Sequence, residues 1–172
     1  MSTTDAFTSL FDRMPDLVHS AVKDLAADDL SRSPSSGANT IAWLVWHLSR
    51  VEDDHVATAA AALGHKGFEQ VWVRDGFADR FGLPLPPDDT GFGHSAEQVA
   101  QVRADGTLLE DYHRAVHEQT QRFLAGLGEE DWESVVDRHW DPPVTLLARL
   151  TSVANEVAQH VGQASYVRGL LS

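Results

Sequence analysis

Apolar residues recur at three- and four-residue steps over four long stretches of the chain, and this is the period of one helix face. In the first stretch they include Phe7, Leu10, Met14, Leu17 and Val18. The four stretches cover about residues 5–27, 40–63, 107–126 and 145–171. Four helices of this length joined by loops predict an all-α four-helix bundle.

Proline, glycine and capping residues mark where these helices break and end. Pro15 interrupts the first stretch, which predicts a kink or a new helix start near Asp12. Asn39 or Thr40 can cap the second helix, and Gly64 can end it in the left-handed conformation. The second helix is apolar on nearly all sides in its first half, so we expect it to be buried there.

The connecting segments differ in length and composition. Residues 28–39 are predicted to form a loop, and residues 64–94 form a long loop between the second and third helices that is rich in Gly, Pro and aromatics. Loops of this length are uncommon unless they cover or line a site. Ser95 starts a short helix with a capping-box pattern that runs to about Ala104, and residues 128–143 are predicted to be a loop. No alternating pattern of useful length predicts a β-strand.

The composition fits one soluble domain over residues 1–172. Hydrophobic residues make up 42% of the chain, which is enough for a core. No apolar run reaches the roughly 18 residues of a membrane-spanning helix. The start of the chain, Met1 to Asp5, lacks the basic and apolar regions of a signal peptide, so we expect a cytoplasmic protein.

Net charge and cysteine content exclude some classes of function. The formal net charge is −13, and such a field repels phosphate backbones and anionic membranes. We therefore expect neither nucleic acid nor a membrane as a partner. The chain has no cysteine, so any thiol in its chemistry must come from a small molecule.

Three residues could form a metal site between two helices. Glu156 and His160 are four residues apart on the last helix, which places both side chains on one face. His47 lies in the apolar half of the second helix, where a buried imidazole needs a partner. Two His and one carboxylate suit Zn²⁺ with a fourth position open, and they would also accept Ni²⁺, Fe²⁺ or Mn²⁺. Spacing alone also fits a hydrogen-bonded core His and an ordinary helix pair.

His113 and His117 form a rival pair with the same four-residue spacing on the third helix. At about 100° per residue, both fall at or beyond the edge of that helix's apolar stripe. Charged residues surround them. We interpret this pair as part of a solvated face rather than as a metal site.

Two motifs resemble the DinB/YfiT-like superfamily. One is the second-helix stretch from Asn39 to Leu48, which contains Trp43 and His47, and the other is the last-helix stretch from Glu156 to Gln163. The resemblance covers nearly the whole chain. It implies a DinB-like four-helix bundle with a divalent metal, and the ligand set of His47, Glu156 and His160 resembles the metal-binding domain of mycothiol-dependent maleylpyruvate isomerase. That isomerase has a second domain, so its own reaction is not expected here.

The resemblance further implies a thiol-dependent S-transferase that uses a low-molecular-weight thiol such as mycothiol or bacillithiol on a small electrophile, and it suggests a homodimer. Two alternatives stay open. One is a metal-dependent hydrolase, for which no general base is identified. The other is a non-enzymatic, stress-associated metal-binding protein, although structural zinc sites usually have four protein ligands.

Four more residues are weaker candidates for a functional role. Asp54 is expected at the surface or rim, and Gln163 could hydrogen-bond the metal ligands or the substrate. Arg149 and Arg168 could meet substrate carboxylates, but surface or interhelix ion pairs are the more ordinary reading. No catalytic residue is assigned.

Overall fold

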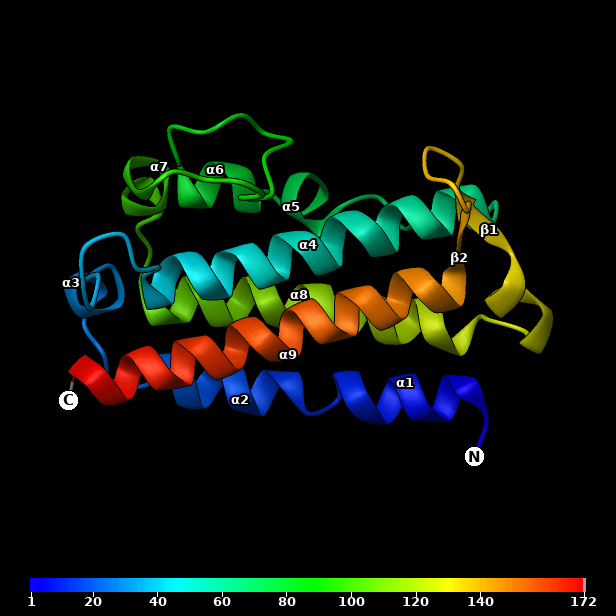
Figure 1. The fold of residues 1–172 in the computed structure, drawn as a ribbon, viewed down its shortest axis with the longest axis horizontal. Coiled ribbons are helices and arrows are strands. Elements are labelled where there is room, and N and C mark those ends of the chain that lie inside the picture. The colour runs from blue at the N-terminus through cyan, green and yellow to red at the C-terminus, as the bar shows by residue number, and fades with distance from the viewer. Residues whose placement is uncertain (172) are drawn as a thin grey trace.

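The computed structural model describes residues 1–171 and is an all-α bundle with one small sheet (Figure 1). Three of its four long elements are single helices, and the fourth is split into α1 and α2. The bounds of these elements are α1 Thr3–Phe11, α2 Met14–Val22, α4 Ile41–Ala62, α8 Gly106–Ala125 and α9 Leu146–Leu171. The predicted four-helix bundle is confirmed.

The helix ends have local causes that the sequence already indicates. Pro15 occupies the first turn of α2, where a missing N–H costs nothing, so the chain starts a new helix there instead of extending α1. The Thr40 side chain accepts a hydrogen bond from the Trp43 amide and caps α4. Gly64 follows α4 with a φ of 78°. These three predictions are confirmed.

The first helical stretch ends earlier than its apolar pattern predicts. α2 stops at Val22 rather than near residue 27, because Lys23 is extended and Asp24 takes a positive φ of 61°. A short helix α3, Ala27–Leu30, follows and buries Leu30. The predicted loop over 28–39 therefore begins inside a helical turn.

The long segment between α4 and α8 is a crossover. Figure 1 shows that α4 and α8 run in the same direction, so the chain must return along the bundle before α8 begins. The segment contains three short helices along α4, where the sequence predicts a loop followed by one short helix. They are α5 Val71–Arg74, α6 Phe77–Phe81 and α7 Ala96–Gln101, the last capped by Ser95 as predicted.

The connection between α8 and α9 also has structure that the sequence does not reveal. It contains a 3₁₀-helix, Glu129–Glu133, and two short antiparallel strands, β1 Val135–Asp137 and β2 Val144–Thr145. Strands of two or three residues are too short to show an alternating pattern, so the expectation of a loop without strands is wrong here.

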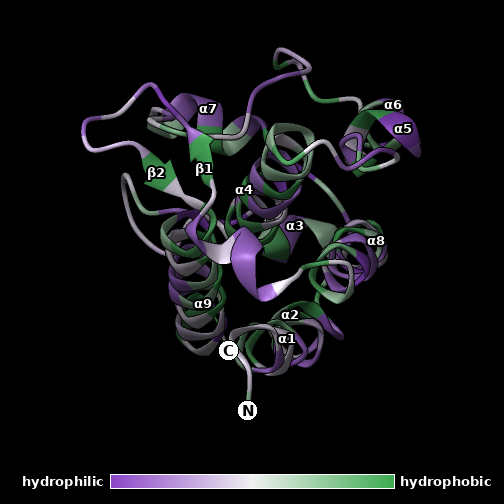
Figure 2. Ribbon diagram, turned by 90° about the vertical axis from the view of Figure 1, so that its right-hand side faces the viewer, coloured by the Kyte–Doolittle hydropathy of each residue, from purple (hydrophilic) through white to green (hydrophobic). Residues whose placement is uncertain are grey.

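The core lies between the four bundle elements, and Figure 2 shows them end-on around it. α4 packs against both α8 and α9, and α2 packs against the same two helices from the other side. Trp46, Leu44 and Leu150 are among the buried core residues. The first half of α4 is fully buried, as its sequence predicts. Among residues 1–171, no helix is long and apolar enough to cross a membrane.

Candidate metal centre

His47 of α4 meets Glu156 and His160 of α9 on the side of the bundle where these two helices pack together. Oε1 of Glu156 lies 3.4 Å from Nε2 of His47 and 3.1 Å from Nε2 of His160. One potential ligand atom from each residue lies within 4.8 Å of the other two. The structure thus brings together the three residues that the sequence singles out.

The second nitrogen of each imidazole has its own acceptor. Nδ1 of His47 lies 2.5 Å from the Thr90 carbonyl oxygen, and Nδ1 of His160 lies 2.8 Å from Oε1 of Gln163. Each acceptor fixes the tautomer in which Nδ1 carries the proton. Both Nε2 lone pairs are then free for a metal, and this arrangement is typical of metal-ligating histidines.

Close packing fixes the position of His47. Its ring stacks on the indole of Trp43, with 4.5 Å between the ring centroids. A Cβ on Gly91 would lie 2.8 Å from Nδ1 of His47 and 2.9 Å from the Trp46 ring, and Gly91 also has a φ of 93°. Only glycine fits both the conformation and the space at this position.

A chain of hydrogen bonds holds the crossover segment over α4 beside His47. The Trp43 indole N–H donates to Nδ1 of His94, and Nε2 of His94 lies 3.0 Å from the Asp89 carboxylate. Asp89 also accepts from the Gly91 amide at 2.7 Å. Because Thr90 lies between these anchored residues, its carbonyl is held against His47.

The protonation state of His47 favours a ligand role. Burial lowers its pKa, and the hydrogen bond to Thr90 and the nearby Glu156 carboxylate oppose that shift. A metal ligand must be a neutral imidazole, so a lowered pKa reduces competition from protons. Two free Nε2 atoms and one carboxylate oxygen fit a divalent metal such as Zn²⁺.

A cavity of about 370 Å³ begins at His47 and Glu156 and runs between α4 and α9 toward the β1–β2 connection. One face of α4 forms one wall and one face of α9 the other. The lining residues are His47, Val51, His55, Thr90, Phe92, Asp137, Trp140, Arg149, Ser152, Val153 and Glu156. The predicted loops over 64–94 and 128–143 thus both contribute to this cavity.

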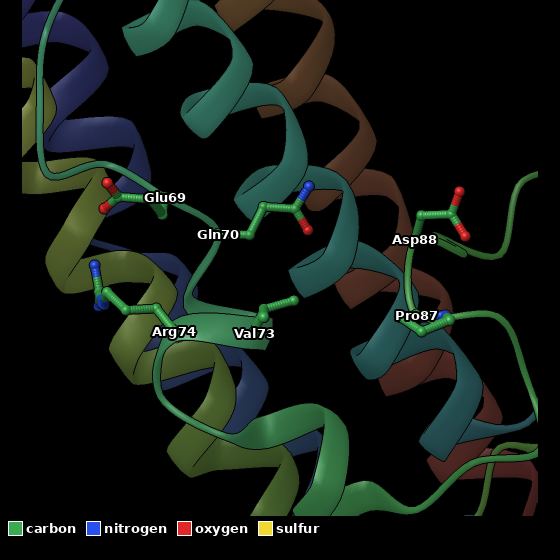
Figure 3. A pocket seen from close by; sticks show the side chains of 6 residues that line it. All are labelled: Glu69, Gln70, Val73, Arg74, Pro87 and Asp88. Atoms are coloured by element: carbon green, nitrogen blue, oxygen red, sulfur yellow. The ribbon is translucent and has the colours of Figure 1, made fainter.

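A second hollow is larger, at about 490 Å³, but lies away from these residues (Figure 3). Two of its polar side chains are already engaged. Gln70 accepts from Arg50 and donates to Asp54, and Arg74 pairs with Asp75. The smaller cavity includes two of the candidate metal ligands and is therefore the better candidate for a functional site.

The rival pair, His113 and His117, is more buried than the sequence predicts. His113 is only 1% exposed, so the expectation that it belongs to a solvated face is wrong. Its position on the edge of the apolar stripe is covered by α2 and α4, which pack against α8 from two sides. His117 is partly buried and contacts Asp12. Among residues 1–171, the only group of three close ligand atoms is that of His47, Glu156 and His160.

The remaining sequence candidates are also placed by the structure. Asp54 accepts from Gln70 and does not line the cavity, and Gln163 contacts His160 as suggested. Arg168 donates to the backbone carbonyls of Ala21 and Lys23. Arg149 forms the ion pair with Asp137 that was considered for it, and it also lines the cavity, so its contact with a substrate carboxylate stays a prediction. Sequence reasoning missed Thr90, because nothing local in the sequence marks a backbone carbonyl that contacts a residue 43 positions away.

Comparisons with known proteins agree with this fold. A conserved protein from Enterococcus faecalis has a similar crystal structure, with a TM-score of 0.87 and 28% identity over 99% of this chain and 98% of that chain. A search of curated proteins gives no match. These findings do not reach the maleylpyruvate isomerase subgroup. The model of the DinB superfamily matches residues 10–164, and the chain belongs to that family.

Proposed function

We propose that this protein binds one divalent metal ion through His47, Glu156 and His160 and uses it to activate a small-molecule thiol for transfer to an electrophile. The observation that carries the proposal is the convergence of three donors, two of which line a cavity. His47 and Glu156 line it, so a metal held by the three residues would have space for a small molecule beside it. A purely structural zinc site is usually closed by a fourth protein ligand.

The residues around the site hold and shield it. Thr90 and Gln163 orient the two imidazoles, and Trp43 covers one face of His47. The His47 side chain is 4% exposed, which keeps water from most of its surface. When bound, a divalent metal lowers the pKa of a coordinated thiol and so supplies the nucleophile near neutral pH. The chain contributes no thiol of its own, since it has no cysteine.

The thiol reading is preferred to hydrolysis because the cavity offers no evident general base. The Asp137 carboxylate is engaged by Arg149 and by the backbone and side chain of His139. His55 lies eight residues after His47, or about 12 Å along α4. The resemblance to thiol-using members of the family adds support, and mycothiol and bacillithiol are the first thiols to test.

The test combines metal analysis with cobalt spectroscopy. We expect the purified protein to contain one divalent metal ion, with Zn²⁺ the first candidate and Ni²⁺ the second. In the Co²⁺-substituted protein, mycothiol or bacillithiol should add a sulfur-to-cobalt charge-transfer band, and the protein itself cannot add one. A spectrum that responds to hydroxamates but to no thiol would favour a hydrolase. A protein that binds no metal would rule out both activities.

A further inference from the structure

Arg149 gives the cavity a cationic end opposite the metal ligands. It lies seven residues before Glu156 on α9, or two helical turns and about 10 Å along the axis. Both residues line the same cavity, and Arg149 is the only Lys or Arg among its lining residues. The chain has a net charge of −13, so the presence of a cationic side chain in this cavity needs a physical explanation.

One side of the Arg149 guanidinium is fixed and the rest of it is free. Its Nη2 donates to Oδ2 of Asp137 at 2.6 Å, and the side chain is 17% exposed. Asp137 is itself held by the amide and the ring of His139. A guanidinium has five N–H donors, and no other hydrogen bond or ion pair of Arg149 is found among residues 1–171. Asp137 therefore orients Arg149 and leaves donors for a ligand.

Two aromatic side chains line the cavity. Phe92 from the crossover and Trp140 from the β1–β2 connection both line it, and they are 93% and 66% exposed. Large exposed aromatics cost hydration free energy unless something covers them. Because they line the same cavity as the metal ligands and Arg149, they suit an apolar or planar part of a ligand.

We infer that the cavity selects a ligand with a carboxylate at one end, bound by Arg149, and its reacting group at the metal site two helical turns away along α9, with the rest of the ligand packed against Phe92 and Trp140. The part of this inference that concerns the reacting group rests on the proposed function. The recognition by Arg149 concerns the other end of the ligand and can be measured without metal. Arginine binds carboxylates through paired N–H donors, so the contact distinguishes a carboxylate from an uncharged group of similar size.

The first experiment compares matched probes on the metal-free full-length chain. Phenylbutyrate and phenylbutanol differ in the terminal carboxylate, and binding is followed by the NMR signal of the Trp140 indole. The acid should bind roughly ten- to hundredfold more tightly than the alcohol, as expected for charge-assisted hydrogen bonds. Equal affinity of the two probes would overturn the inference, whatever the result with metal.

Three variants separate a direct contact from a general effect of charge. Arg149→Gln should abolish the preference for the acid, whereas Arg138→Gln should keep it, because Arg138 is exposed on the same connection and does not line the cavity. Arg149→Gln leaves Asp137 without its partner, and an unpaired carboxylate would repel acids by itself. The double variant Arg149→Gln/Asp137→Asn has no such charge and should still show no preference. A preference that returns in the double variant would show that Arg149 is not the recognition residue.

The last experiment tests the length of the ligand with the Co²⁺-loaded chain. Mercaptopropionate, mercaptohexanoate and mercaptooctanoate are each compared with the corresponding mercaptoalkanol. The advantage of the acid should be greatest for the long chains and absent for mercaptopropionate, which cannot reach Arg149 from the metal. If no thiol changes the cobalt spectrum, the proposed function fails while the metal-free result stands. If thiols bind and the acid has no advantage at any length, the inference fails and the proposed function stands.

Discussion

Two helical pairs in this protein share a four-residue spacing and differ in what faces them. Glu156 and His160 on α9 face His47 of α4, and all three ligand atoms converge. His113 and His117 on α8 contain two imidazoles, but each meets a different neighbour. Nδ1 of His113 lies 3.4 Å from the Ser49 hydroxyl, and His117 contacts Asp12.

The comparison shows that spacing on one helix supplies a pair of donors, whereas a facing helix decides whether the pair becomes a metal site. At the site formed by the α9 pair and His47, each of the two imidazoles also has an acceptor at Nδ1 that frees its Nε2 atom. At the α8 pair, Nε2 of His113 is buried and has no hydrogen-bond partner within the described residues 1–171. Burial lowers the pKa of His113 to about 3, so the ring is a neutral core residue at neutral pH.

The largest effect is expected when one imidazole is removed from each pair. His160→Ala should lose stoichiometric metal, because two remaining donors hold a divalent ion weakly. His113→Ala should keep the full metal content although it leaves a cavity in the core. Metal is measured by elemental analysis after dialysis, and circular dichroism confirms that both variants are folded. Full metal content in His160→Ala would refute the assignment.

Removal of the metal should have the next largest effect. A ligand that binds only the folded state stabilises it by about 2.7 kcal/mol at a hundredfold excess over its dissociation constant. The chelated protein should remain helical, because the buried apolar side chains of the bundle supply a core without the ion. It should melt at a lower temperature in calorimetry. An unfolded metal-free protein would instead indicate a structural metal.

The pH dependence of stability gives a third test, this time of the α8 pair. The pKa of His113 in the folded state is about 3, below its ordinary 6.5, so the unfolded chain binds more protons between these values. The contribution of His113 to wild-type stability should therefore fall as pH decreases below 6.5, by at most about 1.4 kcal/mol per pH unit. His113→Phe should lack this contribution and become relatively more stable toward low pH in urea unfolding.

Two comparisons control that measurement. The first is the His113→Phe protein itself, compared with the wild type at pH 7, where the ring of His113 is largely neutral in both the folded and the unfolded chain. Burial raises the pKa of Glu52 to about 7, so this carboxyl contributes stability below pH 4.5 that is lost as pH rises toward 7. Glu52→Gln should therefore be relatively more stable at pH 7 than at pH 4. The same slope for His113→Phe and wild type would mean that His113 is not buried in solution.

Much of this architecture could be predicted because it depends on local patterns. Periodic apolar residues locate the helices, Pro15 marks the break between α1 and α2, and Thr40 marks the start of α4. The metal-site residues were suggested by spacing and by a buried imidazole, and were selected by family resemblance. These features can be read from a few neighbouring residues.

The missed features depend on contacts between distant segments. The burial of His113 requires knowing which helices cover each side of α8, and its own position on the helix is only at the edge of the apolar stripe. Thr90 and Gly91 matter because the crossover places them against His47, which no local pattern can reveal. The strands of the β1–β2 connection are too short to produce a periodic signal.

The smallest effect is expected when the hydrogen-bond acceptor of His160 is removed. This variant tests whether that acceptor contributes to the difference between the α9 pair and the α8 pair. Gln163→Leu removes the oxygen that lies 2.8 Å from Nδ1 of His160 and leaves the three ligands in place. Loss of such a partner typically lowers metal affinity about ten- to hundredfold, because the ring loses its fixed tautomer and orientation. Competition with a chelating dye measures the affinity. Gln159→Leu is the matched control, since Gln159 is an exposed residue on the same helix. If both variants bind metal as tightly as the wild type, the convergence of donors from two helices alone distinguishes the α9 pair from the α8 pair, and the anchoring of the second nitrogen adds nothing to it.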